Sequence, residues 1–284
     1  MDKIIFGDNQ FFGVNHMSEQ KAIKQAQKFR TPEDIFKTLQ YVNDIGIKSF
    51  MFTTHTQMEP VLEMISADPK FHDFKLYPCM PYAHKYANAL VELGPFEMIK
   101  KFTPGNTIMS GLKGVGSLIS ANPVPVMQLL VDSEMKLLKD NNVHGIFLLN
   151  IITDLLLGLK MYDMLYEFAS YVETKYGVKA GFFTMNYAML HDVLVNKLKM
   201  ENPIIVSNIN KIGFRMNPSK QTVEDSIRQK DCKTIAMSVL ASGAVRPSEA
   251  AEYMESLSGI DAVLFGASTP QHIKETKTIF EKIL

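Results

Sequence analysis

Short apolar runs alternate with longer stretches of helical periodicity along the whole chain. A short apolar run bounded by turn residues is typical of a buried strand, whereas apolar positions spaced three and four apart indicate a helix that covers a core. Strands that alternate with helices in this way form βαβ units, in which neighbouring strands are parallel. The pattern therefore predicts an α/β fold built on a parallel sheet.

Nine runs have the pattern of a strand, one more than a closed (β/α)8 barrel, or TIM barrel, needs. They cover residues 3–7, 47–53, 74–79, 107–111, 145–150, 180–184, 203–208, 234–238 and 262–266. The run at 107–111 lies in a glycine-rich stretch, and we interpret residues 104–122 as an insertion over the barrel mouth. No repeat, low-complexity tract or polar linker divides the chain, so we predict one barrel domain over residues 1–284.

Helix starts are marked clearly between these runs. Thr31 is followed by Pro32 and two acidic residues, which places an N-cap, a first-turn proline and favourable charges ahead of an apolar stretch. Pro218-Ser219 and Arg246-Pro247-Ser248 open two later helices in a similar way.

Composition narrows the classes of partner. Thirty Lys and Arg residues balance thirty Asp and Glu residues, and no basic run with interleaved aromatic residues stands out. Proteins that bind nucleic acid carry a basic patch or stripe, so we predict no nucleic-acid partner. A neutral barrel of this length favours a small-molecule ligand.

The cysteines and the start of the sequence bear on location. Cys79 and Cys232 lie far apart and match no metal or redox spacing, which indicates free thiols in a reducing compartment. The sequence opens on the strand-like run 3–7 without a signal-peptide core, and no apolar run approaches the length of a membrane span. We therefore expect a cytoplasmic protein with no membrane partner, and the oligomeric state stays open.

The last strand-like run leads into a turn suited to an anion. Residues 262–270 read Ala-Val-Leu-Phe-Gly-Ala-Ser-Thr-Pro, in which Ser268 or Thr269 can cap a helix and Pro270 can occupy its first turn. The first amides of a helix lack intrahelical partners and lie at the positive end of its dipole. After the last strand of a barrel, such a turn favours a phosphate-bearing ligand.

In this order of elements the chain resembles the aldo/keto reductases. Residues 46–54 are similar to the family's second strand, and residues 181–186 are similar to its fifth, which ends in a Ser-Asn pair that holds the nicotinamide amide. Residues 238–243 resemble the Ser-Pro-Leu-Ala-x-Gly motif after strand seven, and residues 265–273 resemble the phosphate turn after strand eight. The resemblance implies an oxidoreductase with a nicotinamide cofactor, NADP or NAD. It implies these cofactor contacts: Thr184, Asn186, Ser238, Ser242, Gly243, Gly266, Ser268, Thr269 and His272.

The catalytic tetrad of that family, formed by Asp, Tyr, Lys and His, is missing from its expected places. Thr53 stands at the Asp position, the Tyr position falls near Gln57 or Met58, the strand expected to end in Lys ends at Cys79, and Asn150 takes the His position. Many members bind the 2′-phosphate with an Arg or Lys in the turn, where this chain has His272. That departure weakens NADP specificity and leaves dinucleotide binding itself open.

Substitutes for the tetrad follow the third strand-like run. Tyr82, His84 and Lys85 lie within one helical turn, and Tyr82 and Lys85 would share a face if the segment is helical. A lysine so placed lowers the pKa of a tyrosine, which would suit a proton donor. The alternative is that these are ordinary polar residues at a helix start.

The loop after the first strand-like run is the densest polar and aromatic cluster in the chain. Asp8 is a candidate general base or metal ligand, and Asn9 and His16 are candidates to orient a substrate. For Asp8 alone, stabilisation of a local Asx-type turn explains the residue equally well.

Two further positions complete the predicted substrate lining. His55 and Glu59 are spaced to share a helical face, but a metal would need a third ligand such as Asp8 or His84, so we expect no metal here. Asn150 is a substrate candidate because a carboxamide both donates and accepts hydrogen bonds, although Asn also caps helices.

Three functions stay open. The first is an oxidoreductase acting on a small carbonyl or alcohol metabolite, with Tyr82 or His84 as the acid. The second is a lyase or isomerase acting on a phosphorylated metabolite, with Asp8, Lys85 or His16 in proton transfer. The third is a barrel that binds a ligand without catalysis.

Overall fold

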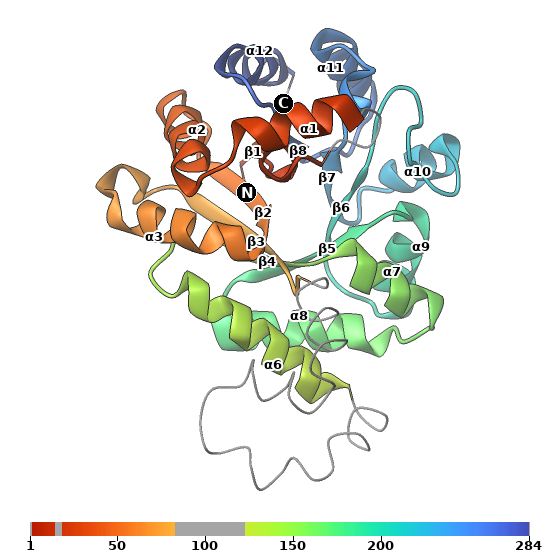
Figure 1. Cartoon of the computed structure of the whole chain (residues 1–284). Coiled ribbons are helices and arrows are strands. Elements are labelled where there is room, and N and C mark those ends of the chain that lie inside the picture. The colour runs from red at the N-terminus through yellow and green to blue at the C-terminus, as the bar shows by residue number, and fades with distance from the viewer. Residues whose placement is uncertain (1, 15–18, 83–122, 284) are drawn as a thin grey trace, which may run out of the picture.

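Eight parallel strands form a closed barrel in the computed structural model, which describes residues 2–14, 19–82 and 123–283 (Figure 1). They are β1 (Ile4–Phe6), β2 (Ser49–Thr53), β3 (Lys75–Met80), β4 (Gly145–Leu148), β5 (Lys179–Thr184), β6 (Ile204–Asn208), β7 (Lys233–Met237) and β8 (Ala262–Phe265). Each strand pairs with its neighbours in sequence, and β1 closes the ring by pairing with β8. The predicted (β/α)8 fold is confirmed. The ninth predicted run, 107–111, and the predicted insertion at 104–122 lie outside the described residues.

Helices surround the barrel (Figure 1). They are α1 (Glu19–Lys28), α2 (Pro32–Asp44), α3 (Glu59–Ala67), α6 (Val124–Met135), α7 (Asn150–Gly158), α8 (Asp163–Tyr176), α9 (Tyr187–His191), α10 (Lys220–Ile227), α11 (Pro247–Ser256) and α12 (Pro270–Phe280). Short 3-10 helices include η1 (Asn9–Phe12), η2 (Thr56–Met58) and η8 (Ala241–Gly243), and a π-helix covers Asp192–Lys197. In the described part of the chain, no helix combines the length and the apolar character needed to cross a bilayer.

The predicted helix starts have a clear structural basis. Thr31 caps α2: its hydroxyl accepts from the Asp34 amide at 3.4 Å, and the Asp34 carboxylate accepts from the Thr31 amide at 3.2 Å. Ser219 caps α10 through the Thr222 amide, and Pro247 begins α11. These contacts satisfy amides that have no partner inside the helix.

Alternation along the strands divides the core into two layers. One set of side chains fills the barrel interior and includes Ile5, Met51, Tyr77, Phe147 and Ile235. The opposite set packs between the strands and the surrounding helices. Successive strand residues point to opposite faces, so one run of apolar residues supplies both layers.

One glycine is required by this packing. A Cβ atom on Gly181 of β5 would lie 2.2 Å from a ring carbon of Phe147, which is fully buried on β4. The Phe147 ring fills the space inside the barrel that a side chain at position 181 would need.

Candidate active site at the barrel mouth

Parallel strands bring the segments after all eight strands to one end of the barrel, which we call the mouth. The residues that follow β1, β2 and β3 meet there. Asp8 follows β1, His55 follows β2 and Tyr82 follows β3. The predicted candidates His16, His84 and Lys85 lie outside the described residues.

Asp8 is a buried carboxylate held by the neighbouring strand. Its side chain is 8% exposed, and Oδ2 accepts from the Thr53 amide at 2.7 Å and from the Thr53 hydroxyl at 2.6 Å. Burial raises the pKa of Asp8, although these hydrogen bonds act in the opposite direction. Asp8 makes no side-chain cap to η1, so its contacts with Thr53 are tertiary rather than those of a local turn.

This contact places the Asp8 carboxylate beside Thr53. In the sequence comparison, Thr53 stands where the aldo/keto reductases have the aspartate of their tetrad. Thr53 occupies that position at the end of β2, and its hydroxyl binds a carboxylate that comes from the end of β1. The carboxylate beside Thr53 therefore comes from the segment after β1. Asn9, the next residue, is exposed at the start of η1.

His55 is a neutral hydrogen-bond donor in an aromatic setting. Its Nδ1 accepts from the Gln57 amide at 3.1 Å, which leaves the ring proton on Nε2. Burial lowers the pKa of His55, so the imidazole is uncharged at neutral pH. The ring lies between Phe12, with centroids 4.6 Å apart, and Tyr82, with centroids 4.9 Å apart.

The sequence pattern suggested that His55 and Glu59 share a helical face. The structure divides this segment, because His55 caps the short helix η2 and Glu59 begins α3. His55 therefore contacts the residues that follow β1 and β3 rather than acting with Glu59.

Tyr82 supplies a second ring donor. Burial raises the pKa of its phenol, and the nearby charge of Asp8 raises it further. The phenol is consequently protonated at neutral pH. This shift is opposite to the lowered pKa expected from a neighbouring lysine, and it makes Tyr82 a weaker proton donor. Tyr82 O–H and His55 Nε2–H are thus two neutral donors on adjoining rings, next to one buried carboxylate.

Glu134 is a residue at this site that the sequence analysis missed. It lies on α6 with no exposed surface, its Oε1 accepts from the Tyr82 amide at 2.9 Å, and its Oε2 accepts from the Thr54 hydroxyl. Glu134 is three residues after the buried Val131 and four before the buried Leu138, so it occupies the apolar face of its helix. An acidic residue among the apolar positions of a predicted helix is the sequence signal that could have identified Glu134 as buried.

We expect Glu134→Gln to lower the free energy of unfolding by about 1–3 kcal/mol, because an amide cannot accept from both donors that the carboxylate serves. Urea denaturation measures the change. Glu63→Gln, on an exposed position of α3, is the matched control and should stay within about 0.5 kcal/mol of the parent. Equal stability of both variants would show that Glu134 does not hold Tyr82 in place.

Side chains after β4 and β5 form a network of their own. The Thr184 hydroxyl donates to Asp154 Oδ1 at 2.5 Å and accepts from the Asn186 amide at 2.9 Å, while Asp154 Oδ2 accepts from the Met185 amide at 3.0 Å. Burial raises the pKa of Asp154. Asn186 caps α9, and its Oδ1 accepts from the Met189 amide at 3.2 Å.

The three predicted residues at the ends of β4 and β5 differ in burial. Thr184 is fully buried and Asn186 is half-buried, and both are engaged in the hydrogen bonds that hold the end of β5. Asn150 is the first residue of α7 and is half-buried after β4.

The loop after β7 has an unusual backbone. Ser238, Ala241 and Ser242 have φ values of 55°, 42° and 56°, and Gly243 has a φ of 92°. Residues other than glycine rarely adopt such left-handed conformations, and they concentrate at functional loops. Ser238 and Ser242 are half-buried, and Gly243 is exposed.

The turn after β8 has the predicted helix start. Thr269 caps α12 by accepting from the His272 amide at 3.3 Å, and Pro270 is the first helical residue. His272 itself is exposed. The ammonium group of Lys28, at the end of α1, donates to the carbonyl of Ser268, which brings a cation to this turn.

Gly266 makes a close approach at the start of the same turn. A Cβ atom there would lie 2.0 Å from Oε1 of Gln10, a buried residue whose Nε2 donates to the Gly7 carbonyl at 2.6 Å. The segments after β1 and β8 are therefore in contact at the mouth.

Comparisons with known proteins agree with the barrel. No protein-family model and no curated protein matches the chain. Two solved structures assigned as aldo-keto reductases from Pseudomonas aeruginosa match 99% of this chain and 90% of theirs at 11% identity, with TM-scores of 0.60 and 0.61. The apo form of Gox0644 matches 100% of this chain and 85% of its own at 10% identity, with a TM-score of 0.57. At this identity the likeness shows the fold alone: the chain has an aldo-keto-reductase-like barrel.

Proposed function

We propose that the protein is an oxidoreductase that reduces a small carbonyl compound, or oxidises the corresponding alcohol, with a nicotinamide cofactor. The observation that carries the proposal is the pair of neutral donors at the mouth, Tyr82 O–H and His55 Nε2–H, on rings whose centroids are 4.9 Å apart. Two donors on adjoining rings suit one carbonyl oxygen, on which negative charge develops during reduction.

A bound nicotinamide cofactor would supply the hydride that reduces the carbonyl carbon. The carbonyl oxygen then needs one proton, which Tyr82 donates as a general acid while His55 Nε2–H holds the oxygen in place. Water restores the phenol proton, so each turn consumes one proton from solution. The Thr54 and Glu134 contacts keep the Tyr82 backbone in position during this transfer.

The loops after β7 and β8 fit the phosphate groups of such a cofactor. The N-terminus of α12 points its positive end toward the turn, Lys28 adds a full positive charge beside Ser268, and Gly243 leaves backbone exposed after β7. Ser242, Gly243, Ser268, Thr269 and Lys28 would hold the phosphates. Lys28 was not among the predicted contacts, since it lies on α1, 240 residues from Ser268.

Calorimetric titration with NADPH, NADP⁺, NADH and inorganic phosphate tests the binding part of the proposal. We expect micromolar binding of a dinucleotide, weakened at least tenfold in Lys28→Glu, because a carboxylate replaces the cation next to the turn. Lys24→Glu, on an exposed position of the same helix, changes the net charge equally and should bind as the parent does. Binding of phosphate without any dinucleotide would contradict the proposal.

A second candidate function is proton transfer on a phosphorylated metabolite by a lyase or isomerase. Asp8 favours it, because burial raises the pKa of this carboxyl and so makes it a better proton acceptor than an exposed aspartate. In that case sugar phosphates bind and dinucleotides do not, so the same titration separates the two functions. Lack of binding by every ligand would favour a barrel without catalysis.

A further inference from the structure

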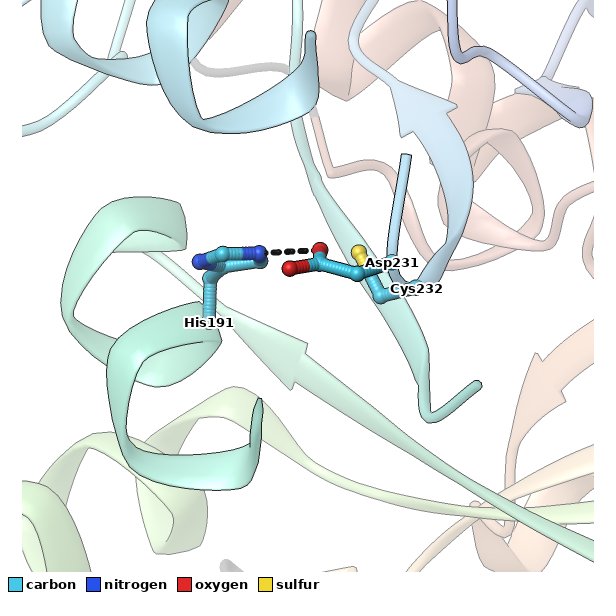
Figure 2. A group of neighbouring side chains, drawn as sticks. All are labelled: His191, Asp231 and Cys232. Carbon is cyan, nitrogen blue, oxygen red and sulfur yellow. Dashed lines mark hydrogen bonds and ion pairs between the residues drawn. The ribbon is translucent and has the colours of Figure 1, made fainter. Parts of the chain in front are cut away.

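A second group of chemically active side chains lies away from the mouth. His191 ends α9, and Asp231 and Cys232 come directly before β7 (Figure 2). Because these last two residues precede the strand, the group lies at the opposite end of β7 from the mouth. Within the described ranges, it is the one cluster of three or more His, Cys, Asp or Glu residues whose ligand atoms converge, all within 4.8 Å of one another.

We propose that His191, Asp231 and Cys232 bind a zinc ion. Imidazole, carboxylate and thiolate are the three ligand types that zinc takes in proteins, at about 2.0–2.3 Å from the metal. In a tetrahedral site, ligand atoms at that radius lie about 3.3–3.8 Å from each other. His191 Nε2 and Asp231 Oδ1 now lie 2.5 Å apart, and all three ligand atoms lie within 4.8 Å of one another, so small side-chain shifts would reach this range.

The charges of the three ligands balance those of the ion. A neutral imidazole, one carboxylate and one thiolate together carry two negative charges, which match Zn²⁺. His191 is 2% exposed and Cys232 is 8% exposed. Burial of a net charge is costly, so a complex without net charge suits these surroundings. The ring proton that His191 Nε2 directs at Asp231 would move to Nδ1 as the metal takes its place, and the two side chains would move apart by about 1 Å.

The Tyr187 side chain adjoins two of the proposed ligands, the Cys232 sulfur and the His191 ring. The Tyr187 hydroxyl lies 2.9 Å from Sγ and 2.6 Å from the Thr234 hydroxyl, so Tyr187 can donate to sulfur while it accepts from Thr234. The Tyr187 ring also stacks on His191, at an interplanar angle of 13°. Such contacts fix the orientation of metal ligands and raise metal affinity.

The exposed side of the cluster provides the entry path. The Asp231 side chain is 36% exposed, whereas His191 and Cys232 lie beneath it. Metal ions can therefore enter on the Asp231 side, and a water molecule can complete four ligands there. The inference goes beyond the sequence analysis, which interpreted Cys232 as a free thiol and considered a metal only beside His55 and Glu59.

Zinc titration of the full-length protein, after treatment with a chelator, tests the proposal by competition with a chromophoric chelator. We expect one zinc ion per chain. Cobalt substituted for zinc should give the absorption bands of a tetrahedral site with a thiolate ligand. Zinc binding should also release a proton, detected by calorimetry in buffers of different ionisation enthalpy, because the Cys232 thiol loses its proton when it becomes a thiolate ligand.

Matched variants distinguish zinc binding at the proposed site from zinc binding elsewhere on the surface. Cys232→Ser should abolish the thiolate band and weaken zinc binding by at least about 100-fold. Cys79→Ala and His72→Asn, which change the other cysteine and an exposed histidine, should leave both unchanged. Asp231→Asn is a second ligand variant on the exposed side, should Cys232→Ser fail to fold.

The proposal is overturned if the parent protein shows no thiolate band, or if its zinc affinity equals that of Cys232→Ser. His191 and Asp231 would then form only an ion pair that joins α9 to the segment before β7.

Discussion

Tyr82→Phe should reduce the rate of carbonyl reduction by about 10²–10⁴, the range that a single general acid contributes. The substitution keeps the ring that packs on His55 and removes only the hydroxyl that donates the proton. Dinucleotide affinity should stay unchanged, because the proposed phosphate contacts follow β7 and β8 whereas Tyr82 follows β3. Initial rates with a panel of small aldehydes and ketones, together with calorimetry, measure the two quantities separately.

Tyr166→Phe is the control for this experiment. Tyr166 lies on α8, one of the helices that surround the barrel, and is 51% exposed, so its hydroxyl should not matter for the rate. A Tyr82→Phe variant as active as the parent would move the role of acid to another residue. A loss of dinucleotide binding together with the rate would mean that Tyr82 shapes the site rather than acting in the chemistry.

Asp8→Asn should raise stability at neutral pH and alter catalysis. An asparagine oxygen can still accept from the Thr53 amide and hydroxyl, but it carries no charge that burial penalises. We expect the free energy of unfolding to rise by about 0.5–2 kcal/mol, the range that single stabilising substitutions commonly reach. A stabilised variant with impaired function is the behaviour expected of an active-site residue.

The pH dependence of this difference has a definite sign. Burial raises the pKa of Asp8 above its ordinary value of 3.8, so the folded protein holds this proton at pH values where the unfolded chain has lost it. The contribution of Asp8 to stability is therefore fully present below pH 3.8 and is lost as the pH rises through the raised pKa. The advantage of Asp8→Asn should grow across this window and then become constant.

Urea denaturation of both proteins at several pH values measures this trend, with Asp140→Asn on an exposed position as the control. The pH–rate profile gives an independent readout. The charge of Asp8 helps to raise the pKa of Tyr82, so its removal should shift the alkaline limb of the profile to lower pH. A stability difference that shrinks with rising pH would contradict the assignment of a destabilising buried charge to Asp8.

Local signals in the sequence were sufficient for the strands and helices, and their number together with the resemblance to the aldo/keto reductases predicted the barrel. Each strand is a short apolar run, and the boundaries differ from the predicted ones by a few residues at most, as at β4, which ends at Leu148 because Asn150 already belongs to α7. The caps at Thr31 and Thr269 were likewise visible, since a cap depends on residues three positions apart.

The sequence also placed the candidate site at the mouth, because residues after parallel strands must gather at one end. The sequence could not show which of these residues contact one another. Asp8 binds Thr53 across 45 residues, and Glu134 reaches the Tyr82 amide across 52 residues. The proposed zinc ligands His191 and Asp231 are 40 residues apart, so spacing rules for nearby cysteines and histidines do not detect them.

The sequence by itself therefore determined the order of strands and helices, the closed barrel and the end at which its polar loops meet. Those properties depend on periodicity and capping, which act over a few residues. Only the tertiary structure decided which side chains touch, which carboxylates are buried and which aromatic rings adjoin. Those properties depend on how strands and helices pack, and that packing places distant residues within hydrogen-bonding distance.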